Sequence, residues 1–296
     1  MNMTVNLAGN TVYAGLFGYL GNGIKRGIIK NMAVVNSTVS ITHSTSSAFA
    51  GAISGYSHTS LISNCYNTGD VNIKTDYVAY AGGITGNSDS PLDFCYNTGV
   101  VSAIATNNMS NNGWAFVGGI AGSLWSTINN CFNTGDINAT ADSKPHAGGI
   151  TGELFSASAI MNCYNKGNIS ALALPSYSTY AYAGGIAGAY ERSHISNCYS
   201  TGTLNAVGAG GIVGVITMIY PSTPLIINAY YLNNIFSAFG RNNSGGSLTD
   251  VFENVNILTS TQMCQQDSFV GFDFDNVWAI NPVANNGYPY LRGTQS

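Results

Sequence analysis

Apolar and polar residues alternate with a period of two in many short segments of this chain, such as Val71-Asn72-Ile73 and Ile137-Asn138-Ala139. This alternation is typical of β-strands that bury one face. Gly, Asn and Ser separate the segments, at positions where turns are expected. No window between Tyr13 and Asn228 has the 3.6-residue period of an amphipathic helix. The pattern therefore predicts an all-β protein.

The strand segments belong to a repeat that covers most of the chain. Its first motif is a Gly-apolar-x-Gly unit that occurs seven times, with 26 to 37 residues between consecutive copies. The closing glycines are Gly18, Gly55, Gly86, Gly122, Gly152, Gly188 and Gly214. In five repeats a second motif follows, first as NCYNTG at residues 64–69. A unit of about 30 residues with three short strands and three turns predicts one coil of a parallel β-helix, a β-solenoid of about seven coils.

Variation in repeat length is confined to one part of the unit. The spacing from the closing glycine to the Cys position is 9 to 11 residues, whereas the spacing from the TG glycine to the next paired glycine is 9 to 20. Stacked coils tolerate insertions where the chain leaves the ladder, so we expect these loops along one edge. They contain four aromatic residues, which we predict as a candidate ligand surface, with ordinary loop packing as the alternative. These residues are Tyr77, Trp114, Tyr177 and Tyr180.

The repeat resembles the GLUG repeat of bacterial surface proteins, through Ala14-Gly15-Leu16-Phe17-Gly18 and the NCYNTG motif that follows. The resemblance extends from about Val5 to Leu232, and the aromatic remainder around Trp278 is similar to the segment that closes such arrays. GLUG repeats are found in adhesin-like proteins and in the non-catalytic region of some immunoglobulin A metallopeptidases. The resemblance therefore implies a cell-surface β-solenoid, while the HExxH zinc motif of those peptidases is absent from this sequence.

The cysteines of the second motif share one repeat position, and stacking is expected to bring them into a column. These are Cys65, Cys95, Cys131, Cys163 and Cys198. Met32 and Ala229 take the position at the two ends, which favours a small buried slot filled by free thiols. Disulfides between neighbours are the alternative, but stacked Cβ vectors are parallel and rarely reach disulfide geometry.

Asparagines directly precede four of the five cysteines and stand two residues after four of them, and they predict amide ladders at the turns, with a polar ligand site as the alternative. The aromatic column Tyr66, Tyr96, Phe132, Tyr164, Tyr199 and Tyr230 follows the cysteines directly. Strict alternation from Ile62 would point Tyr66 inward, whereas a kink at Asn64 would point Cys65 inward and Tyr66 outward. We favour the kink, because a thiol suits a cramped interior better than a phenol does. An aromatic stripe on the surface follows, either as a structural ladder or as a platform for sugar rings or a partner.

Composition excludes several classes of function. The 296 residues include 9 Lys and Arg and 13 Asp and Glu, which gives a formal net charge of −4. Binding to a nucleic-acid backbone requires clustered Lys and Arg, so we expect no nucleic-acid partner. No stretch approaches the roughly 20 apolar residues that span a bilayer, so we expect no transmembrane segment.

Parallel β-helices often act on polysaccharides, and the carboxylates were therefore compared. Asp70 and Asp136 share a repeat position two coils apart, at about 9 to 10 Å by strand spacing. This is near the separation of an inverting glycosidase pair, but both residues follow a TG turn, where a solvated Asp is common. We predict no catalytic residue, no metal site and no cofactor.

The chain opens without a charged and apolar secretion signal and almost inside a repeat, so we expect a fragment of a longer exported protein. Residues 1–235 are predicted as the solenoid and residues 236–296 as an aromatic-rich cap over its last coil. We predict a non-enzymatic module of the cell surface or the extracellular medium, a stalk or an adhesin. A carbohydrate-binding or carbohydrate-active β-helix, similar to a glycosidase or lyase, is the alternative. Expected partners are a host or cell-surface protein or glycan, and a second copy through the solenoid ends.

Overall fold

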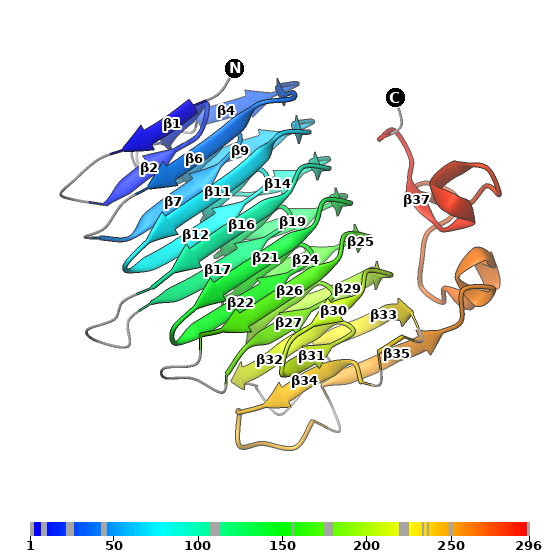
Figure 1. Cartoon of the computed structure of the whole chain (residues 1–296). Coiled ribbons are helices and arrows are strands. Elements are labelled where there is room, and N and C mark those ends of the chain that lie inside the picture. The colour runs from blue at the N-terminus through cyan, green and yellow to red at the C-terminus, as the bar shows by residue number, and fades with distance from the viewer. Residues whose placement is uncertain are drawn as a thin grey trace.

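The computed structural model describes residues 3–6, 11–21, 27–42, 46–106, 113–155, 157–174, 180–218, 225–232, 234–235, 237–248 and 251–294. Within these residues, parallel strands stack coil upon coil from the N-terminal end to β34 and β35 (Figure 1). Four sheets run along the stack, which we name A, B, C and D in the order in which each coil visits them. Sheets A and B have seven strands each, which confirms the all-β solenoid of about seven coils. The prediction of three strands per coil was wrong, because each coil has four sides.

Sheets A and B pack face to face around one of the two cores of the solenoid. Sheet A supplies Val and Ile, such as Val71 and Ile73, and sheet B supplies alanines, such as Ala79 and Ala81. The small alanine side chains let the two sheets lie close together. The strands of sheet A are β1 (Met3–Asn6), β6 (Thr38–Thr42), β11 (Asp70–Thr75), β16 (Val101–Ala105), β21 (Ile137–Ala141), β26 (Ile169–Ala173) and β30 (Leu204–Asn205). The strands of sheet B are β2 (Val12–Ala14), β7 (Ala48–Gly51), β12 (Val78–Gly82), β17 (Trp114–Gly118), β22 (Lys144–Gly148), β27 (Tyr182–Gly184) and β31 (Gly208–Gly210).

Sheets C and D enclose the second core, which is filled by larger side chains such as Ile84, Leu124 and Ile62. The strands of sheet C are β3 (Phe17–Leu20), β8 (Ser54–Ser57), β13 (Thr85–Ser88), β18 (Ala121–Leu124), β23 (Thr151–Leu154), β28 (Ala187–Glu191), β32 (Val213–Met218) and β34 (Phe239–Asn242). The longer path of sheet D consists of β4 (Gly27–Lys30), β9 (Ser60–Ser63), β14 (Leu92–Asp93), β19 (Thr127–Asn129), β24 (Ala159–Met161), β29 (His194–Ser200), β33 (Ile226–Leu232) and β35 (Phe252–Leu258). Its short strands are β5 (Ala33–Val34), β10 (Tyr66–Asn67), β15 (Tyr96–Asn97), β20 (Phe132–Asn133) and β25 (Tyr164–Asn165).

A bend within sheet D settles the orientation of the cysteines and tyrosines. Asn64 has a φ of 51°, and equivalent asparagines in later coils have nearly the same value. Asn adopts this left-handed conformation more readily than most residues do. The bend turns Cys65 into the core and Tyr66 outward, as the kink at Asn64 predicted. All five cysteines of the column are fully buried and free, which confirms the thiol ladder.

An asparagine ladder follows the turn from sheet D to sheet A. The side-chain amide of Asn97 donates to Oδ1 of Asn133 at 2.8 Å, and the amide of Asn133 donates to Asn165 at 2.9 Å. Asn133 also donates to the carbonyl of Gly135 and accepts from its amide. These buried amides therefore satisfy each other and the turn backbone, which confirms the predicted ladder.

The coil is narrowest where the turn between sheets B and C meets this ladder. A Cβ on Gly83 would lie 2.4 Å from Cγ of Asn97, and a Cβ on Gly86 would lie 2.6 Å from the carbonyl oxygen of Gly55. Only glycine permits this approach, which explains the Gly-apolar-x-Gly motif. The two cores lie on either side of this narrow turn. The outer faces of sheets B and C contact each other across it and form a groove, as the rings of Tyr13 and Tyr19 show.

The C-terminal segment turns back and lies beside the stack, with the C-terminus near the earlier coils (red in Figure 1). Its elements are η1 (Gln262–Cys264), η2 (Gln266–Ser268), β36 (Trp278–Ala279), η3 (Ala284–Gly287) and β37 (Tyr290–Leu291), and β36 pairs with β37 in an antiparallel hairpin. The predicted solenoid boundary at residue 235 stays a prediction. However, β34 pairs in parallel with β32, and β35 pairs in parallel with β33, so the sheets continue to Leu258.

The aromatic column of sheet D, which we name the covered ladder, packs beneath this segment. It consists of Tyr66, Tyr96, Phe132, Tyr164, Tyr199 and Tyr230. Trp278 is fully buried, and its ring centroid lies 6.1 Å from that of Tyr164 and 5.9 Å from that of Tyr199. The prediction of an exposed stripe was therefore wrong for Phe132 to Tyr230, because the C-terminal aromatic residues cover the flank of the solenoid rather than its last coil.

Candidate functional site

A second aromatic column runs along the groove between sheets B and C, and we name it the groove stripe. Its members are Tyr13, Phe49, Tyr80, Phe116, His146 and Tyr182, which occupy one register position of sheet B. This stripe was not predicted from the sequence. The signal was present, since each member stands two residues before the glycine that ends its sheet B strand or, in the first coil, follows it.

Sheet C forms the opposite wall of the groove, and its outward residues change along the stack. Tyr19 and Tyr56 face the first rings of the stripe, with Tyr19 5.4 Å and Tyr56 6.2 Å from the ring of Tyr13. Further along, the same register position holds Asn87, Ser123, Glu153, Ala189, Val215 and Arg241. Rings from both walls therefore fill the N-terminal half of the groove, whereas the wall in the other half is polar or small.

A hollow of about 360 Å³ lies in this second half of the groove. Sheet B contributes Lys144, His146 and Tyr182 to its lining, and Tyr180 precedes β27. The other lining residues are Ser143, Val215, Thr217 and Asn243. Alternation along β22 explains the placement, because Lys144 and His146 point outward while Ala147 enters the core between sheets A and B.

Two cations lie over aromatic rings at this end of the groove. Nζ of Lys144 is 4.1 Å from the ring centroid of Trp114, and the guanidinium carbon of Arg241 is 5.0 Å from that of Tyr180. Both distances are within the range of cation–π attraction. Nε of Arg241 also donates to Oδ1 of Asn243 at 2.8 Å. The two cations are thereby held beside the hollow.

Titratable groups facing this region are shifted toward their neutral forms. Burial raises the pKa of Glu153 to about 8, with Lys144 opposing and Glu191 adding to the rise. Burial, together with nearby Lys144, lowers the pKa of His146 to about 3. At neutral pH His146 is therefore uncharged and Glu153 is mostly protonated, so that Glu153 does not supply a full counter-charge to Lys144.

Several polar atoms of the groove are buried without a partner. Nδ1 of His146, the hydroxyl of Tyr182 and Nε1 of Trp114 have no hydrogen bond within the described part of the chain. A buried polar atom without a partner costs roughly 1–3 kcal/mol, so such atoms require an explanation. The ring of Tyr182 is held in place by close packing, since a Cβ on Gly208 would lie 2.4 Å from it.

The predicted ligand residues lie near the edge between sheets A and B, where the connections vary in length as expected. Tyr77 is 39% exposed and Tyr180 is 46% exposed, while Trp114 is half-buried. The backbone amide of Trp114 donates to the carbonyl of Tyr77, and Lys144 on the next coil covers the Trp114 ring. Tyr177 lies outside the described residues. The structure thus places Tyr77 and Trp114 together, and Tyr180 beside the hollow.

The carboxylates compared with a glycosidase pair act as links between coils. Oδ1 of Asp70 accepts a hydrogen bond from the backbone amide of Val100, and Oδ1 of Asp136 accepts one from the amide of Asn168. Each Asp therefore binds the turn of the following coil. Within the described ranges, no three His, Cys, Asp or Glu side chains are grouped so that they could hold a metal ion.

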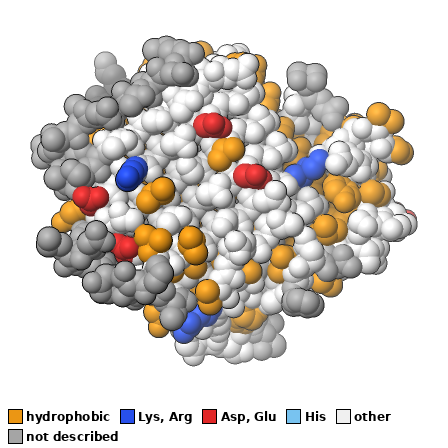
Figure 2. Space-filling model, in the orientation of Figure 1, with side chains coloured by type: hydrophobic (Ala, Val, Ile, Leu, Met, Phe, Trp, Pro, Cys, Tyr) orange, Lys and Arg blue, Asp and Glu red, His pale blue; other side chains and the backbone are white. Residues whose placement is uncertain are grey.

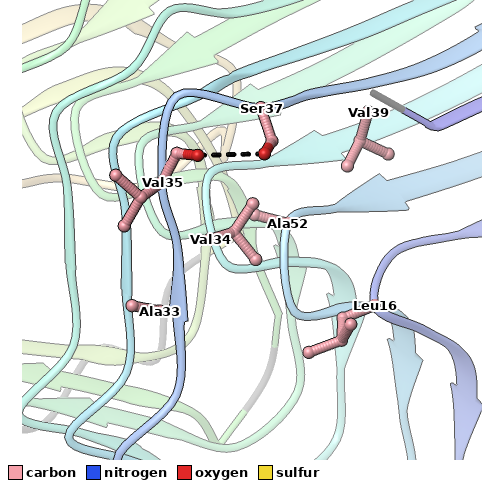
Figure 3. Close-up of a pocket in the computed structure, with 7 residues that line it drawn as sticks. All are labelled: Leu16, Ala33, Val34, Val35, Ser37, Val39 and Ala52. Carbon is pink, nitrogen blue, oxygen red and sulfur yellow. Dashed lines mark hydrogen bonds between the residues drawn. The ribbon is translucent and has the colours of Figure 1, made fainter. Parts of the chain in front are cut away.

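A second hollow, of about 320 Å³, lies at the N-terminal end of the solenoid (Figure 3). Figure 3 shows Leu16, Val34, Val39 and Ala52 around it, with Ser37 donating to the carbonyl of Val35 at the rim. Leu16 is 45% exposed, although Ile53 at the same repeat position is fully buried. This end therefore exposes an apolar side chain whose equivalent in the next coil is buried.

Among the described residues, charged side chains are sparse on the face in Figure 2. None of the helices in the described part of the chain is long and apolar enough to cross a membrane.

Comparisons with known proteins place one repeat in a family. The GLUG motif matches residues 179–205, the coil that contains β27 to β30, so the chain carries this motif as the sequence resemblance implied. A search of curated proteins gave no significant match. A crystal structure from Bacteroides ovatus, whose protein is named as a candidate immunoglobulin A1 protease, is similar over 99% of this chain and 87% of that chain. The two have 21% sequence identity and a TM-score of 0.43.

Proposed function

We propose that this chain is a non-enzymatic repeat module of a secreted or cell-surface protein, in which the solenoid is a rigid stalk with an adhesive edge. The observation that carries the proposal is the continuity of the ladders across coils. Thiols, amides and aromatic rings repeat in register, and the amide chain alone runs from Asn67 through Asn97 and Asn133 to Asn165. The GLUG motif supports the same role.

Rigidity follows from the way in which these contacts are shared. Each coil is hydrogen-bonded to its neighbours through four sheets, and the covered ladder is buttressed from outside by the C-terminal segment. In solenoids each repeat contacts mainly its neighbours, so a fault in one coil would weaken the rod locally. A segment that packs along several coils, as Trp278 does against Tyr164 and Tyr199, opposes that weakness.

The adhesive edge is proposed to consist of Tyr77, Trp114, Tyr177 and Tyr180, which belong in the sequence to connections of variable length or, for Trp114, to the strand that follows one, in a chain with few charges. Its partner would be a host or cell-surface protein or glycan. The exposed apolar side chains at the N-terminal end, such as Leu16, support the further proposal of self-association through solenoid ends.

Stretching the whole chain between its ends by optical tweezers tests the stalk. A stalk is expected to rupture cooperatively, with most coils released in one step. Successive release of single coils at low force would contradict the proposal. Incubation with a panel of polysaccharides tests the non-enzymatic assignment, because an increase in reducing ends or unsaturated products would overturn it.

Adhesion is tested with beads that carry the whole chain, on surfaces coated with glycoproteins. A Tyr77→Ala and Trp114→Ala double variant should bind fewer beads than the wild type does. Lys74→Ala, at an exposed position of sheet A, is the matched control. Equal binding by the double variant and the control would contradict the adhesive edge.

A further inference from the structure

We propose that the hollow in the C-terminal half of the groove between sheets B and C binds an acidic sugar, a pyranose that carries a carboxylate. The proposal deepens the adhesive function and rests on it. Its core residues are Lys144, His146, Tyr180 and Tyr182.

The size of the hollow suits a sugar unit. Its volume of about 360 Å³ is at the lower end of the roughly 300–1,000 Å³ that is usual for small-molecule sites. Opposite the stripe, the small side chain of Ala189 replaces the tyrosines found earlier on this wall, and Ala189 and Val215 pack with Tyr182. The hollow therefore lies in the part of the groove where sheet C no longer carries aromatic rings such as Tyr19 and Tyr56.

Charge at the hollow selects an anion. Lys144 and Arg241 are two of only nine Lys and Arg residues in the chain, and both are held over rings beside the hollow. Glu153 and Glu191 are acids of this region, and Glu153 is mostly neutral at pH 7 because burial raises its pKa. Asp142, two residues before Lys144, is a third acid, buried with its Oδ2 unpartnered in the described part of the chain. A ligand carboxylate would supply the counter-charge that Glu153 does not fully supply to Lys144 and would gain a charge-assisted hydrogen bond.

Polar and aromatic groups favour a hydroxyl-rich ring over a simple acid. The buried hydroxyl of Tyr182 and Nδ1 of His146 have no partner in the described chain, and sugar hydroxyls can donate to one and accept from the other. The face of a pyranose is lined by C–H groups, which pack on aromatic rings such as that of Tyr180, 46% exposed. Acid, hydroxyls and an apolar face occur together in uronic and sialic acids.

Isothermal titration calorimetry on the whole chain tests the site with three probes: methyl glucuronide, the methyl glycoside of N-acetylneuraminic acid, and neutral methyl glucoside. At least one acidic probe should bind about tenfold more tightly than the neutral sugar, as expected from one charged hydrogen bond. Lys144→Gln should remove this preference. Tyr182→Phe keeps the ring but removes the tyrosine hydroxyl, and it should weaken binding of the acidic probe about fivefold.

Lys74→Gln is the matched control, because it removes an exposed lysine from sheet A and leaves the groove intact. Circular dichroism melting of each variant establishes that it is folded. Binding of acidic and neutral probes with equal affinity would overturn the proposal, and so would equal binding by Lys144→Gln and Lys74→Gln. If no probe binds while beads still adhere through the Tyr77 and Trp114 edge, the sugar site fails and the adhesive module stands.

Discussion

The covered ladder and the groove stripe are both aromatic columns with one residue per coil, yet they differ in order. Neighbouring rings of the covered ladder from Tyr66 to Tyr199 are 4.8 to 5.1 Å apart and within 5° of parallel. In the groove stripe the Phe116–His146 pair is tilted by 74° and the His146–Tyr182 pair by 58°. The parallel column is covered by the C-terminal segment from Phe132 to Tyr230, and the tilted rings of the groove stripe, His146 and Tyr182, line a hollow. Both columns have one aromatic residue per coil, so the element that packs against a column, here the C-terminal segment, decides whether the column has a structural role.

The seal is reinforced by polar contacts between the covered ladder and the C-terminal segment. The hydroxyl of Tyr199 donates to the carbonyl of Pro289 and accepts from the amide of Asn285, and Lys166 donates to Oδ1 of Asn285. The hydroxyl of Tyr230 donates to the carbonyl of Val270 at 3.0 Å. In contrast, the hydroxyl of Tyr182 in the groove stripe is buried without a partner. The phenols of Tyr199 and Tyr230 are therefore satisfied, as expected for structural residues, whereas Nε1 of Trp278 is buried without a partner in the described part of the chain.

The largest expected effect comes from breaking the seal. Trp278→Ala removes a fully buried ring that stacks on Phe272 at 4.6 Å and contacts the covered ladder. It should lower the free energy of unfolding by about 3–5 kcal/mol, measured by urea denaturation. Trp125→Ala is the control, since Trp125 is 51% exposed and stacks on Phe155 at the surface, and it should cost less than about 1.5 kcal/mol. Similar losses in the two variants would show that the segment is not a buttress.

A smaller loss should follow from breaking the amide ladder beneath the covered ladder. Asn133→Ala leaves the amides of Asn97 and Gly135 and the oxygen of Asn165 without a side-chain partner. We expect a loss of about 1–3 kcal/mol in the free energy of unfolding, again from urea denaturation. Asn138→Ala, at an exposed position of sheet A, should change it by less than about 0.5 kcal/mol. A neutral Asn133→Ala would mean that the ladder does not stabilise the stack.

His146 makes the groove stripe sensitive to acid. The folded-state pKa is lowered to about 3, whereas an unfolded His titrates near 6.5. Stability is therefore complete above pH 6.5 and is lost as the pH falls, because only the unfolded chain takes up the proton. His146→Phe, which extends the Phe116 ring column, should remove a penalty of about 1 kcal/mol at pH 5.5 and none from titration at pH 7.5. Parallel melting temperatures of the two proteins from pH 7.5 to 5 would contradict this assignment.

The smallest effect is expected at the end of the covered ladder that the segment reaches least. Tyr66 is half-buried, and its ring lies 4.8 Å from that of Tyr96, beside a hollow of about 300 Å³ that Thr294 also lines. Tyr66→Ala should cost only about 0.5–1 kcal/mol in the same urea assay. A loss as large as that of Trp278→Ala would show that cover is not what distinguishes the two regions.

Much of the fold was predictable because the repeat carries local rules. Glycines mark the narrow point between sheets B and C, where a Cβ on Gly83 has no room, and Asn64 supplies the left-handed bend that turns Cys65 inward. The same rules predicted the thiol column and the amide ladder. Each depends on backbone geometry and side-chain size within one coil, which stacking then multiplies.

The candidate site was predictable only in part. Trp114 and Tyr180 were found from their place on variable connections, but Lys144, His146 and Tyr182 were not, since the groove that unites them forms only when sheets B and C fold together. The coil, its turns and its buried columns could be derived from the amino-acid order, because these follow from contacts between equivalent residues of neighbouring coils. The tertiary structure alone decided the four-sided cross-section, the groove and the path of Trp278 along the flank. These features arise from contacts between segments at different repeat positions, and the period of the repeat does not predict such contacts.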